Sequence, residues 1–287
     1  MALTNLSVGL DGTSISRDAL AWAVGAAGVA NAHLRAIQVW TAPVVNTYRG
    51  TGPSTEELIQ HARAIISSSV SATETSDVVD SVIVHGAPGP CLTAEATDAD
   101  LLVIGRSNRA FDTPTTFGEV LVGSTTRYCV NHAAVPVAVI PAGSRWMAAP
   151  HVVVGVDGSA TSLAALRWAA HSLPADATIH AVHAMVHPGD AGEIPMDYEL
   201  LDPIIAANRT QLQQLVAAET DGCAMPVRCH VIIGSALDIL IDLGFHYDLV
   251  ILGEHGETAA VEGVLGSVAD HTLRHAPVPL IVVPSAG

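Results

Sequence analysis

The sequence predicts two consecutive α/β domains, each built on a parallel β-sheet that helices cover on both faces. Three observations predict this fold: the chain repeats itself once, helical apolar periods alternate with short apolar runs, and the length suits two domains. At about 150 residues per domain, 287 residues make roughly two, and a hydrophobic content of 49% is enough for two buried cores.

The repeat is carried by short matching segments whose offset changes along the chain. The offset is 146 positions at the first motif, 148 in the middle and 143 near the end of each copy, so the first copy holds five extra residues before its last helix. The copies meet near residues 142–150, and we expect domains at residues 1–144 and 149–287. The matching segments are VGLDG at 8–12 and VGVDG at 154–158, LLVIG at 101–105 and LVILG at 249–253, and Gly123-Ser124 and Gly266-Ser267.

The first strand of each copy is expected near residues 4–10 and 151–156, and an amphipathic helix follows each of them. In both helices apolar residues recur at positions i, i+3, i+4 and i+7, which places them on one helical face. These residues are Leu20, Ala23, Val24 and Ala27 in the first copy and Leu166, Ala169, Ala170 and Leu173 in the second.

The later strands have a different pattern. Residues 101–104 and 249–252 are apolar without alternation, as expected for parallel strands covered on both faces. Pro136 and Pro279 stand at the start of the last strand, where a missing N–H is tolerated, so this strand is expected at an edge. Each copy therefore reads as five strands and about four helices, a doubly wound domain that binds ligands beyond the carboxyl ends of its strands.

The charge balance excludes several classes of function. The 28 acidic residues outnumber 12 basic ones, giving a formal charge of −16, so extended binding to nucleic acid is not expected. All twelve basic residues are arginines. Without lysine the chain has neither the P-loop lysine of a Walker NTPase nor the amine of a Schiff-base enzyme.

The sequence predicts a cytoplasmic protein with no membrane partner. Its start, MALTNLSVGLDG, lacks a basic segment followed by a long apolar one, and no apolar stretch reaches the roughly 18 residues of a membrane span. The cysteines Cys91, Cys129, Cys223 and Cys229 form no C-x-x-C pair. Cys223 and Cys229 are close enough in sequence for a local disulfide, but we expect reduced thiols.

A glycine motif follows the fourth strand of the second copy. Gly253 and Gly256 are separated by two residues, and nine more residues lead to Gly266-Ser267 at the start of a helix. Glycines let backbone N–H groups approach a phosphate, and the helix N-terminus adds free donors and partial positive charge. Alternatively, these glycines only shape a turn and a helix cap.

The glycine motif, the VGVDGS segment at 154–159 and the HAPVP segment at 275–279 together resemble the universal stress protein family. The resemblance covers nearly the whole chain, twice. It implies two five-stranded domains of the adenine nucleotide alpha hydrolase-like fold, with strand order 3-2-1-4-5. It also implies an internal pseudo-dimer paired through the last strands, and a possible homodimer. One subgroup of the family binds ATP through this motif, whereas another lacks the motif and does not.

The resemblance also implies binding residues by position. Asp157 would contact the adenosine part of the nucleotide, and Ala184 would offer backbone groups to the adenine. The residues that would hold ribose and phosphates are Gly253, Gly256, Gly266, Ser267 and Val268. The matching positions in the first copy are Asp11, Val39, Gly105, Asn108, Gly123, Ser124 and Thr125. For both aspartates, a cap at the start of the following helix is the alternative.

Each copy departs from the motif in its own way. The first has Asn108 at the second glycine position and the five extra residues in the loop, although Arg106 and Arg109 add positive charge and Asn tolerates positive φ. The second keeps the spacing but carries three glutamates, which weaken binding if they face phosphates and matter little if they face water. These are Glu254, Glu257 and Glu262.

Fourteen histidines raise the possibility of a metal site, but their pattern favours structural roles. His271 and His275 share a helical face, yet the first copy has Tyr128 at the position of His271, and no HExxH motif is present. His183 and His187 flank a strand end. His255 lies inside the glycine loop and could donate to a phosphate.

The sequence therefore predicts an ATP-binding stress regulator or sensor, with Mg²⁺ as a possible companion of the nucleotide. No repeated Ser, His and Asp set points to a triad, so we expect no dedicated catalysis. Two alternatives stay open. One is an interaction scaffold whose pockets no longer bind nucleotide, and the other is a weak Mg²⁺-dependent ATPase that uses Asp11 or Asp157.

Overall fold

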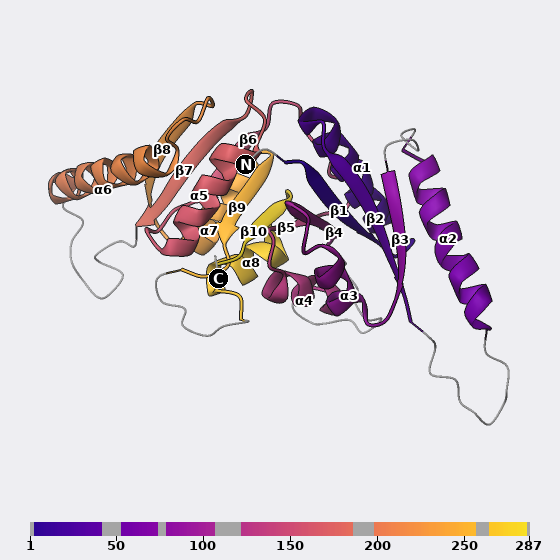
Figure 1. Ribbon diagram of the computed structural model, residues 1–287. Helices are drawn as coiled ribbons and strands as arrows, with labels where there is room; N and C mark the ends of the chain where they lie inside the picture. Colours follow the sequence, from indigo (N-terminus) through magenta and orange to yellow (C-terminus); the bar gives the residue numbers. More distant parts are fainter. Residues whose placement is uncertain are drawn as a thin grey trace. The chain divides into compact units, whose positions relative to one another are not determined.

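The computed structural model describes residues 3–41, 53–73, 79–106, 122–185, 198–256 and 264–285. The chain divides into two compact units, the first unit Leu3–Trp146 and the second unit Met147–Gly287. Each unit is an α/β structure with its own sheet (Figure 1). The predicted fold class is confirmed.

The first unit alternates strands and helices. Its elements are β1 (Asn5–Leu10), α1 (Ser14–Ala30), β2 (His33–Trp40), α2 (Thr55–Ser71), β3 (Val79–His85), α3 (Pro88–Glu95), β4 (Leu101–Gly105), α4 (Ser124–His132) and β5 (Val137–Ile140).

The second unit repeats this order. Its elements are β6 (His151–Gly155), α5 (Ala160–Ser172), β7 (Thr178–Met185), α6 (Tyr198–Glu219), β8 (Val227–Ile233), α7 (Ala236–Gly244), β9 (Leu249–Gly253), α8 (Ser267–His275) and β10 (Leu280–Val283).

All strand pairs within each unit are parallel, and the two sheets have the same order. The first sheet runs β3-β2-β1-β4-β5 and the second β8-β7-β6-β9-β10, which confirms the predicted order 3-2-1-4-5. From β6 the chain first builds outward to β7 and β8, and then returns to place β9 on the other side of β6. The switch point of this sheet therefore lies between the carboxyl ends of β6 and β9.

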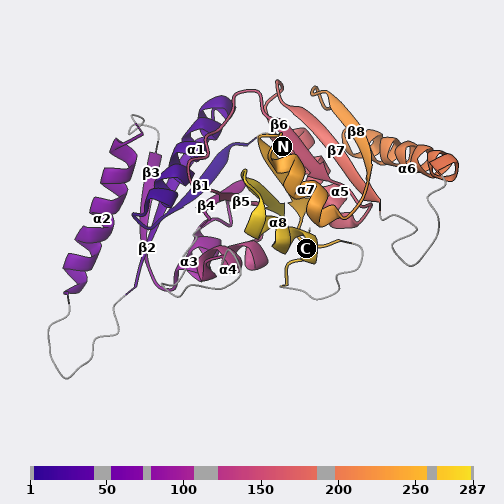
Figure 2. The same cartoon turned by 180° about the vertical axis from the view of Figure 1, so that it is seen from behind.

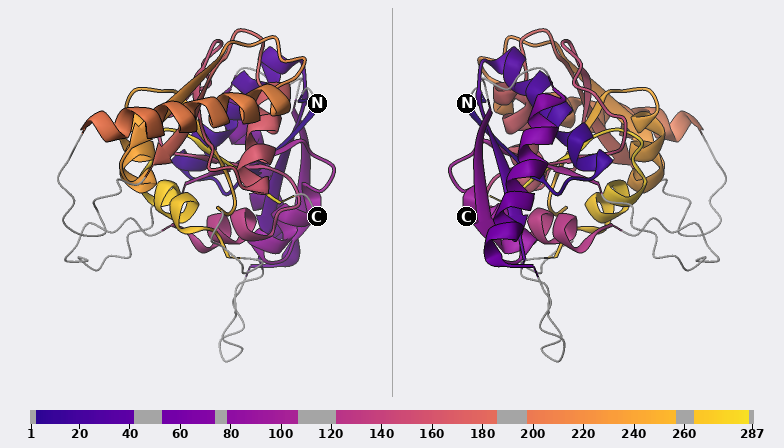
Figure 3. Two further views of the ribbon diagram at one scale, coloured as in Figure 1. Left: turned by 90° about the vertical axis from the view of Figure 1, so that its left-hand side faces the viewer. Right: turned by 90° about the vertical axis from the view of Figure 1, so that its right-hand side faces the viewer.

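Helices cover both faces of each sheet. In the second unit α5 and α6 pack together on one face, and α7 and α8 pack together on the other. Figure 1 shows α5 against one face, and Figure 2, seen from behind, shows α7 against the opposite face. The side views in Figure 3 bring α6 and α2 to the front, where each crosses the outer strands of its own sheet.

Two-sided cover explains the apolar runs in the sequence. Leu101, Leu102 and Val103 of β4 are fully buried, and Val250 and Ile251 of β9 are as well. Burial of one such side chain contributes about 1.5–3 kcal/mol. The strands thus need no polar alternation, as the sequence predicted.

The helical faces also follow the predicted period. Leu20, Ala23 and Ala27 of α1 are buried, while Val24 lies at the margin of the face. In α5, Leu166 and Ala169 are completely inaccessible to solvent. The helices begin at side-chain caps, since Thr13 and Ser159 accept hydrogen bonds from the backbone N–H groups of Ser16 and Ser162.

The segment that joins the copies is anchored to α1 of the first unit. The carboxylate of Asp18 accepts hydrogen bonds from the backbone N–H of Gly143 at 2.8 Å and from the Arg145 guanidinium at 2.9 Å. These contacts, led by the Gly143 N–H, lower the pKa of Asp18. The ring of Trp146 meets that of Trp22 edge-on, with centroids 4.8 Å apart. The first unit therefore extends to Trp146.

All four cysteines are free thiols, including Cys223 and Cys229. Burial raises the pKa of Cys129 to about 12, so this thiol stays protonated. Within the ranges that the structure describes, no helix is both long and apolar enough to cross a bilayer.

Replacing Leu166 by Ala is expected to lower the free energy of unfolding of the second unit by about 2–5 kcal/mol, because Leu166 is completely buried and the substitution leaves a cavity. Urea denaturation followed by circular dichroism measures the change. Val29→Ala is the control, since Val29 is 45% exposed, and it should change stability by less than about 0.5 kcal/mol. Equal losses in the two variants would contradict the burial argument.

Candidate functional site

A cavity of about 280 Å³ lies at the carboxyl edge of the second sheet, at its switch point. Strands β6, β7 and β9, helices α5, α7 and α8 and the glycine loop supply its walls, and all seven binding residues expected in the second copy line it. The lining residues are Gly155, Val156, Asp157, Ser162, Val182, Ala184, Ala236, Leu240, Leu252, Gly253, Glu254, His255, Gly256, Gly266, Ser267, Val268 and Ala269.

Asp157 lies in the turn between β6 and α5. Its Oδ1 accepts hydrogen bonds from the Ser159 backbone N–H at 3.0 Å and the Ser159 hydroxyl at 2.6 Å. Gly158, between them, has φ of +93°, which an L side chain rarely adopts. Ser159 is the residue that caps α5, so the aspartate supports the cap instead of forming it, and it lines the cavity as well.

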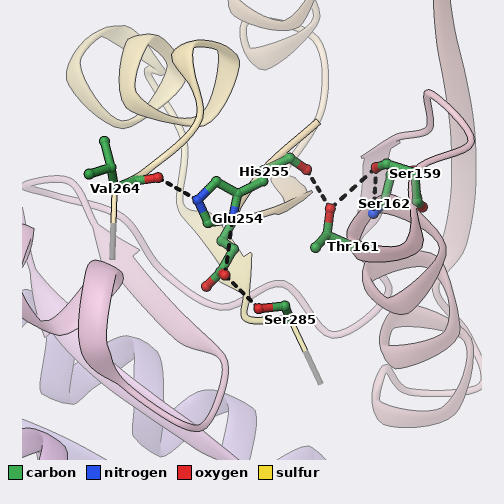
Figure 4. A network of polar contacts seen from close by, with 7 residues as sticks. All are labelled: Ser159, Thr161, Ser162, Glu254, His255, Val264 and Ser285. Carbon is green, nitrogen blue, oxygen red and sulfur yellow. Dashed lines mark hydrogen bonds and ion pairs between the residues drawn. The ribbon is translucent and has the colours of Figure 1, made fainter. Parts of the chain in front are cut away.

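Gly253 ends β9 where the strand meets the first turn of α5. A Cβ at this position would come within 2.6 Å of the backbone carbon of Thr161, so no side chain fits. The Thr161 hydroxyl donates a hydrogen bond to the carbonyl oxygen of His255 and contacts the Ser159 hydroxyl at 3.2 Å (Figure 4). Thr161 thus joins α5 to the glycine loop.

Gly256 and Gly266 hold the loop close to its neighbours. A Cβ on Gly256 would lie 2.7 Å from Oδ2 of Asp157, and a Cβ on Gly266 would lie 3.2 Å from both the Glu254 carbonyl oxygen and the His255 Cα. The Gly266 N–H donates to that Glu254 oxygen at 2.8 Å. At Gly266, whose φ of −61° is ordinary, a Cβ would press on the backbone of the loop, whereas at Gly256 it would meet the end of the Asp157 side chain.

The N-terminus of α8 faces the same cavity. Gly266 caps this helix without a side-chain hydrogen bond, whereas Ser159 caps α5 with one. The residues of its first turn, Ser267, Val268 and Ala269, line the cavity. Their backbone N–H groups belong to the donors that a helix cannot satisfy internally, so this wall favours an anionic group.

A second polar network closes the loop from the other side. Oε1 of Glu254 accepts a hydrogen bond from the Ser285 hydroxyl at 2.7 Å and lies 3.0 Å from Nδ1 of His255. The other ring nitrogen of His255 contacts the carbonyl oxygen of Val264 (Figure 4). Both nitrogens of His255 are therefore engaged within the loop. We assign this residue to holding the loop and not, as the sequence suggested, to donating to a phosphate.

The first unit has a matching cavity of about 330 Å³. Asp11, Val39, Gly105, Gly123, Ser124 and Thr125 line it, as expected from the resemblance. Asp11 supports the helix cap at Thr13 with the same 3.0 and 2.6 Å contacts that Asp157 makes. The first unit has Ile15 at the position of Thr161, and Ile15 packs against Gly105 without a hydroxyl to donate. Asn108 and Arg109 fall outside the described residues, as do Glu257 and Glu262.

The histidine pair on α8 has a structural role. Nδ1 of His275 lies 2.9 Å from the carbonyl oxygen of His271, and the two ring centroids are 4.3 Å apart. Tyr128 and His132 form the corresponding pair on α4, but their rings are stacked nearly parallel, with centroids 4.2 Å apart. His183 contacts the Val156 carbonyl oxygen at 2.8 Å, and His187 is among the residues not described. Across the described ranges, no cluster of three or more His, Cys, Asp or Glu is placed to hold a metal ion.

Several contributors to the site were missed from the sequence. Thr161 joins α5 to the loop, Ser285 comes from the segment after β10, and Leu240 forms an apolar wall from α7. Thr161 could have been noticed, because the repeat aligns it with Ile15 and only one copy carries a hydroxyl. For Ser285 and Leu240 the repeat gives no such signal.

A scan against protein-family models matches the Universal stress protein family twice, over residues 3–141 and 149–284. The two matches cover nearly all of both units. The chain belongs to the universal stress protein family. It is thus a tandem member with two universal stress protein domains, as the sequence resemblance implied.

Relatives of this tandem type match over nearly their full length. A universal stress protein of Mycobacterium tuberculosis (strain CDC 1551 / Oshkosh) is 27% identical over 312 residues, covering 97% of this chain and 95% of the relative. The crystal structure of a universal stress protein from Archaeoglobus fulgidus DSM 4304 has a TM-score of 0.67 at 16% identity and covers 99% of this chain and 98% of its own. Another solved universal stress protein, in complex with cAMP, matches 50% of this chain with a TM-score of 0.38.

Thr161→Val is expected to lower the free energy of unfolding of the second domain by about 1 kcal/mol, because it removes the hydroxyl that bonds the His255 carbonyl but keeps the side-chain shape. Urea denaturation measures this loss. Thr210→Val is the matched control, since the exposed Thr210 hydroxyl bonds only to the Ala206 carbonyl of its own helix. A loss no larger than that of the control would show that Thr161 does not join α5 to the loop.

Proposed function

We propose that the second domain binds an adenine nucleotide, ATP, in the cavity at its switch point. One observation carries the proposal: residues from separate parts of the chain, named by the glycine motif and the family resemblance, line a single cavity. Its volume of about 280 Å³ is near the lower end of the 300–1,000 Å³ typical of small-molecule sites.

The residues present fit such a ligand. Val182, Leu240 and Leu252 supply an apolar surface for a purine base, and Ala184, the residue before the last one of β7, lines the same cavity. Asp157 lines the same cavity, and its carboxylate can accept hydrogen bonds from the hydroxyls of a ribose. Gly256 and Gly266 leave room that a Cβ would fill, so backbone N–H groups can approach a phosphate closely.

The charges around the cavity also accommodate phosphates. The N-terminus of α8 offers partial positive charge without a lysine or arginine. Glu254, one of the glutamates that could repel phosphates, is paired with His255 and Ser285, and its side chain is only 15% exposed. An Mg²⁺ ion would be held mainly by the phosphates themselves.

The first domain is proposed as the weaker site. It keeps Asp11, Gly105 and Gly123-Ser124 around its cavity. However, Ile15 cannot join the helix start to the loop as Thr161 does in the second domain. The first domain thus lacks one hydrogen bond that would preorganise its site, and preorganisation raises affinity.

We infer that the protein acts in the cytoplasm as a regulator or sensor whose state changes with adenine nucleotide, without dedicated catalysis. Pairing of the two domains through their last strands, and of two chains as a homodimer, stays a prediction from the family resemblance. The scaffold and ATPase alternatives are separated from this proposal by the two experiments that follow.

Gly266→Val is expected to abolish ATP binding by the second domain while the protein stays folded, because the branched side chain intrudes between Gly266 and the Glu254–His255 backbone. Calorimetric titration with ATP and Mg²⁺ measures binding, and a thermal unfolding curve checks the fold. Gly28→Val is the matched control, since a Cβ at Gly28 meets nothing within 4 Å.

If the Gly266→Val protein still binds some ATP, the same titration is repeated with Gly123→Val added. Loss of the remaining binding would assign that binding to the first domain. If neither the parent protein nor the control binds ATP at millimolar concentration, the scaffold alternative replaces this proposal. Unchanged binding in Gly266→Val would place the nucleotide elsewhere.

Asp157→Asn separates the two roles of this residue. The amide oxygen can still accept the two hydrogen bonds from Ser159, so the helix cap and the free energy of unfolding should be preserved within about 0.5 kcal/mol. Loss of the charge should weaken ATP binding by about tenfold, the cost of one charged hydrogen bond. Equal ATP affinities of variant and parent would show that Asp157 does not contact the nucleotide. Mg²⁺-dependent ATP hydrolysis by the parent protein that is lost in the variant would favour the ATPase alternative.

A further inference from the structure

Three histidines form a continuous chain of ring contacts across the second sheet. Nδ1 of His151 on β6 lies 3.3 Å from Nε2 of His180 on β7, and Nδ1 of His180 lies 3.1 Å from Nε2 of His230 on β8. The successive ring centroids are 5.6 and 5.2 Å apart. We call these three residues the histidine ladder.

The ladder runs from solvent into the core and out again. His151 is exposed, His180 is only 4% exposed and His230 is half-buried. The ring of Tyr247, in the turn before β9, lies 4.6 Å from that of His180 and covers it. A proton can therefore reach either end of the ladder but not its middle ring directly.

The ladder lies on the cavity side of the sheet. Alternate residues of a strand share a face, so His180 points to the same side as Val182 and Ala184, which line the cavity. His230 is the strand partner of Val182 in the β7–β8 register. The ladder thus joins β8, at the edge of this sheet, to the strand that forms the cavity wall.

A count of hydrogen atoms limits what the ladder can bind. In the neutral form each ring carries one N–H, and the two contacts between rings use one hydrogen each. The third hydrogen then occupies one end of the ladder, and the nitrogen at the other end is bare. One added proton fills that nitrogen and leaves both contacts intact. A second would bring two N–H groups face to face between neighbouring rings.

We propose that the histidine ladder is a proton-binding site, which takes up one proton with its strands paired and releases β8 from β7 when a second proton binds. Release of this strand would make the outer half of the second domain sensitive to acid. The proposal is independent of nucleotide binding.

The surroundings oppose a second positive charge. Burial, together with His230, His151 and Arg228, lowers the pKa of His180 to about 4. Burial, Arg228 and Arg209 of α6 likewise lower the pKa of His230. The Asp248 carboxylate, on the turn that carries Tyr247, accepts the backbone N–H of His151 at 2.8 Å. Because the folded pKa of His180 is lowered, the opened form binds more protons, and opening becomes more favourable as the pH falls below about 6.5.

The first unit provides an internal control, because it has the same strands without the ladder. The strand registers place Asn5, Arg35 and Val82 at the positions of the three histidines. Ala99 occupies the position of Tyr247. Strand β3 is thus the counterpart of β8. Because the first unit forms the same sheet without these histidines, the ladder is not required for the fold.

Hydrogen exchange of the full-length chain between pH 7.5 and 4.5, followed by mass spectrometry, tests the proposal. Peptides covering Val227–Ile233 and Val79–His85 report on β8 and β3, and protection factors remove the pH dependence of the chemical exchange. Protection of β8 is expected to fall at least about tenfold per pH unit below about pH 6.5, while that of β3 stays constant. A parallel loss in β3 and β8 would overturn the proposal.

His230→Gln keeps a side chain that can donate and accept but cannot bind a proton. We expect the pH dependence of β8 protection to become shallower in this variant, because one of the three rings that bind protons in the opened form is lost, whereas His171→Gln, which changes an exposed histidine of α5, keeps the full dependence. If His230→Gln proves unstable, nitrogen NMR of the parent protein's histidine rings gives the answer. His180 should stay neutral while the ladder takes up its first proton. The proposal would be contradicted if all three rings titrated independently while β8 stayed paired with β7.

Discussion

The arrangement of both domains depends on the close approach of a strand-end glycine to the first turn of a helix. Gly253 leaves no room for a Cβ against the Thr161 backbone, and a Cβ at Gly105 would lie 2.7 Å from the Ile15 side chain and 3.1 Å from its backbone. This contact brings the carboxyl ends of two neighbouring strands to the start of the helix between them. The turn with Asp157, the glycine loop and the N-terminus of α8 then surround the same space. The cavity is therefore a consequence of backbone packing, and a side chain at Gly253 would separate its walls.

The two domains share this backbone arrangement but differ in the side chains around it. Only the second has the hydrogen bond from the Thr161 hydroxyl to the glycine loop. Only the second has the histidine ladder across β6, β7 and β8. At the equivalent positions of the first domain, Ile15 has no hydroxyl and Arg35 is exposed. Since both domains fold, the differences are not needed for folding. The two copies have therefore diverged in these side chains while keeping the same backbone arrangement.

The sequence predicted most of the fold and only part of the site. Unbroken apolar runs and the helical period of Leu166 and its neighbours require burial on specific faces, so the strands and helices could be located. The glycine motif could be placed at a strand end for the same reason. The partners of His255 could not be predicted, because the contacts of its ring with Glu254 and Val264 depend on the folded conformation of the loop. The ladder depends on strand register, which brings together histidines that lie far apart in the sequence.

The edge-on contact between Trp22 and Trp146 makes the first domain optically distinct from the second. Two indoles whose centroids are 4.8 Å apart are close enough for their electronic transitions to couple, which gives paired circular dichroism bands of opposite sign. The second domain has Trp168 at the position of Trp22 but no second indole at the end of its own unit. The chain therefore carries a built-in spectroscopic signal for the attachment of its joining segment, separate from the signals of the domain that follows.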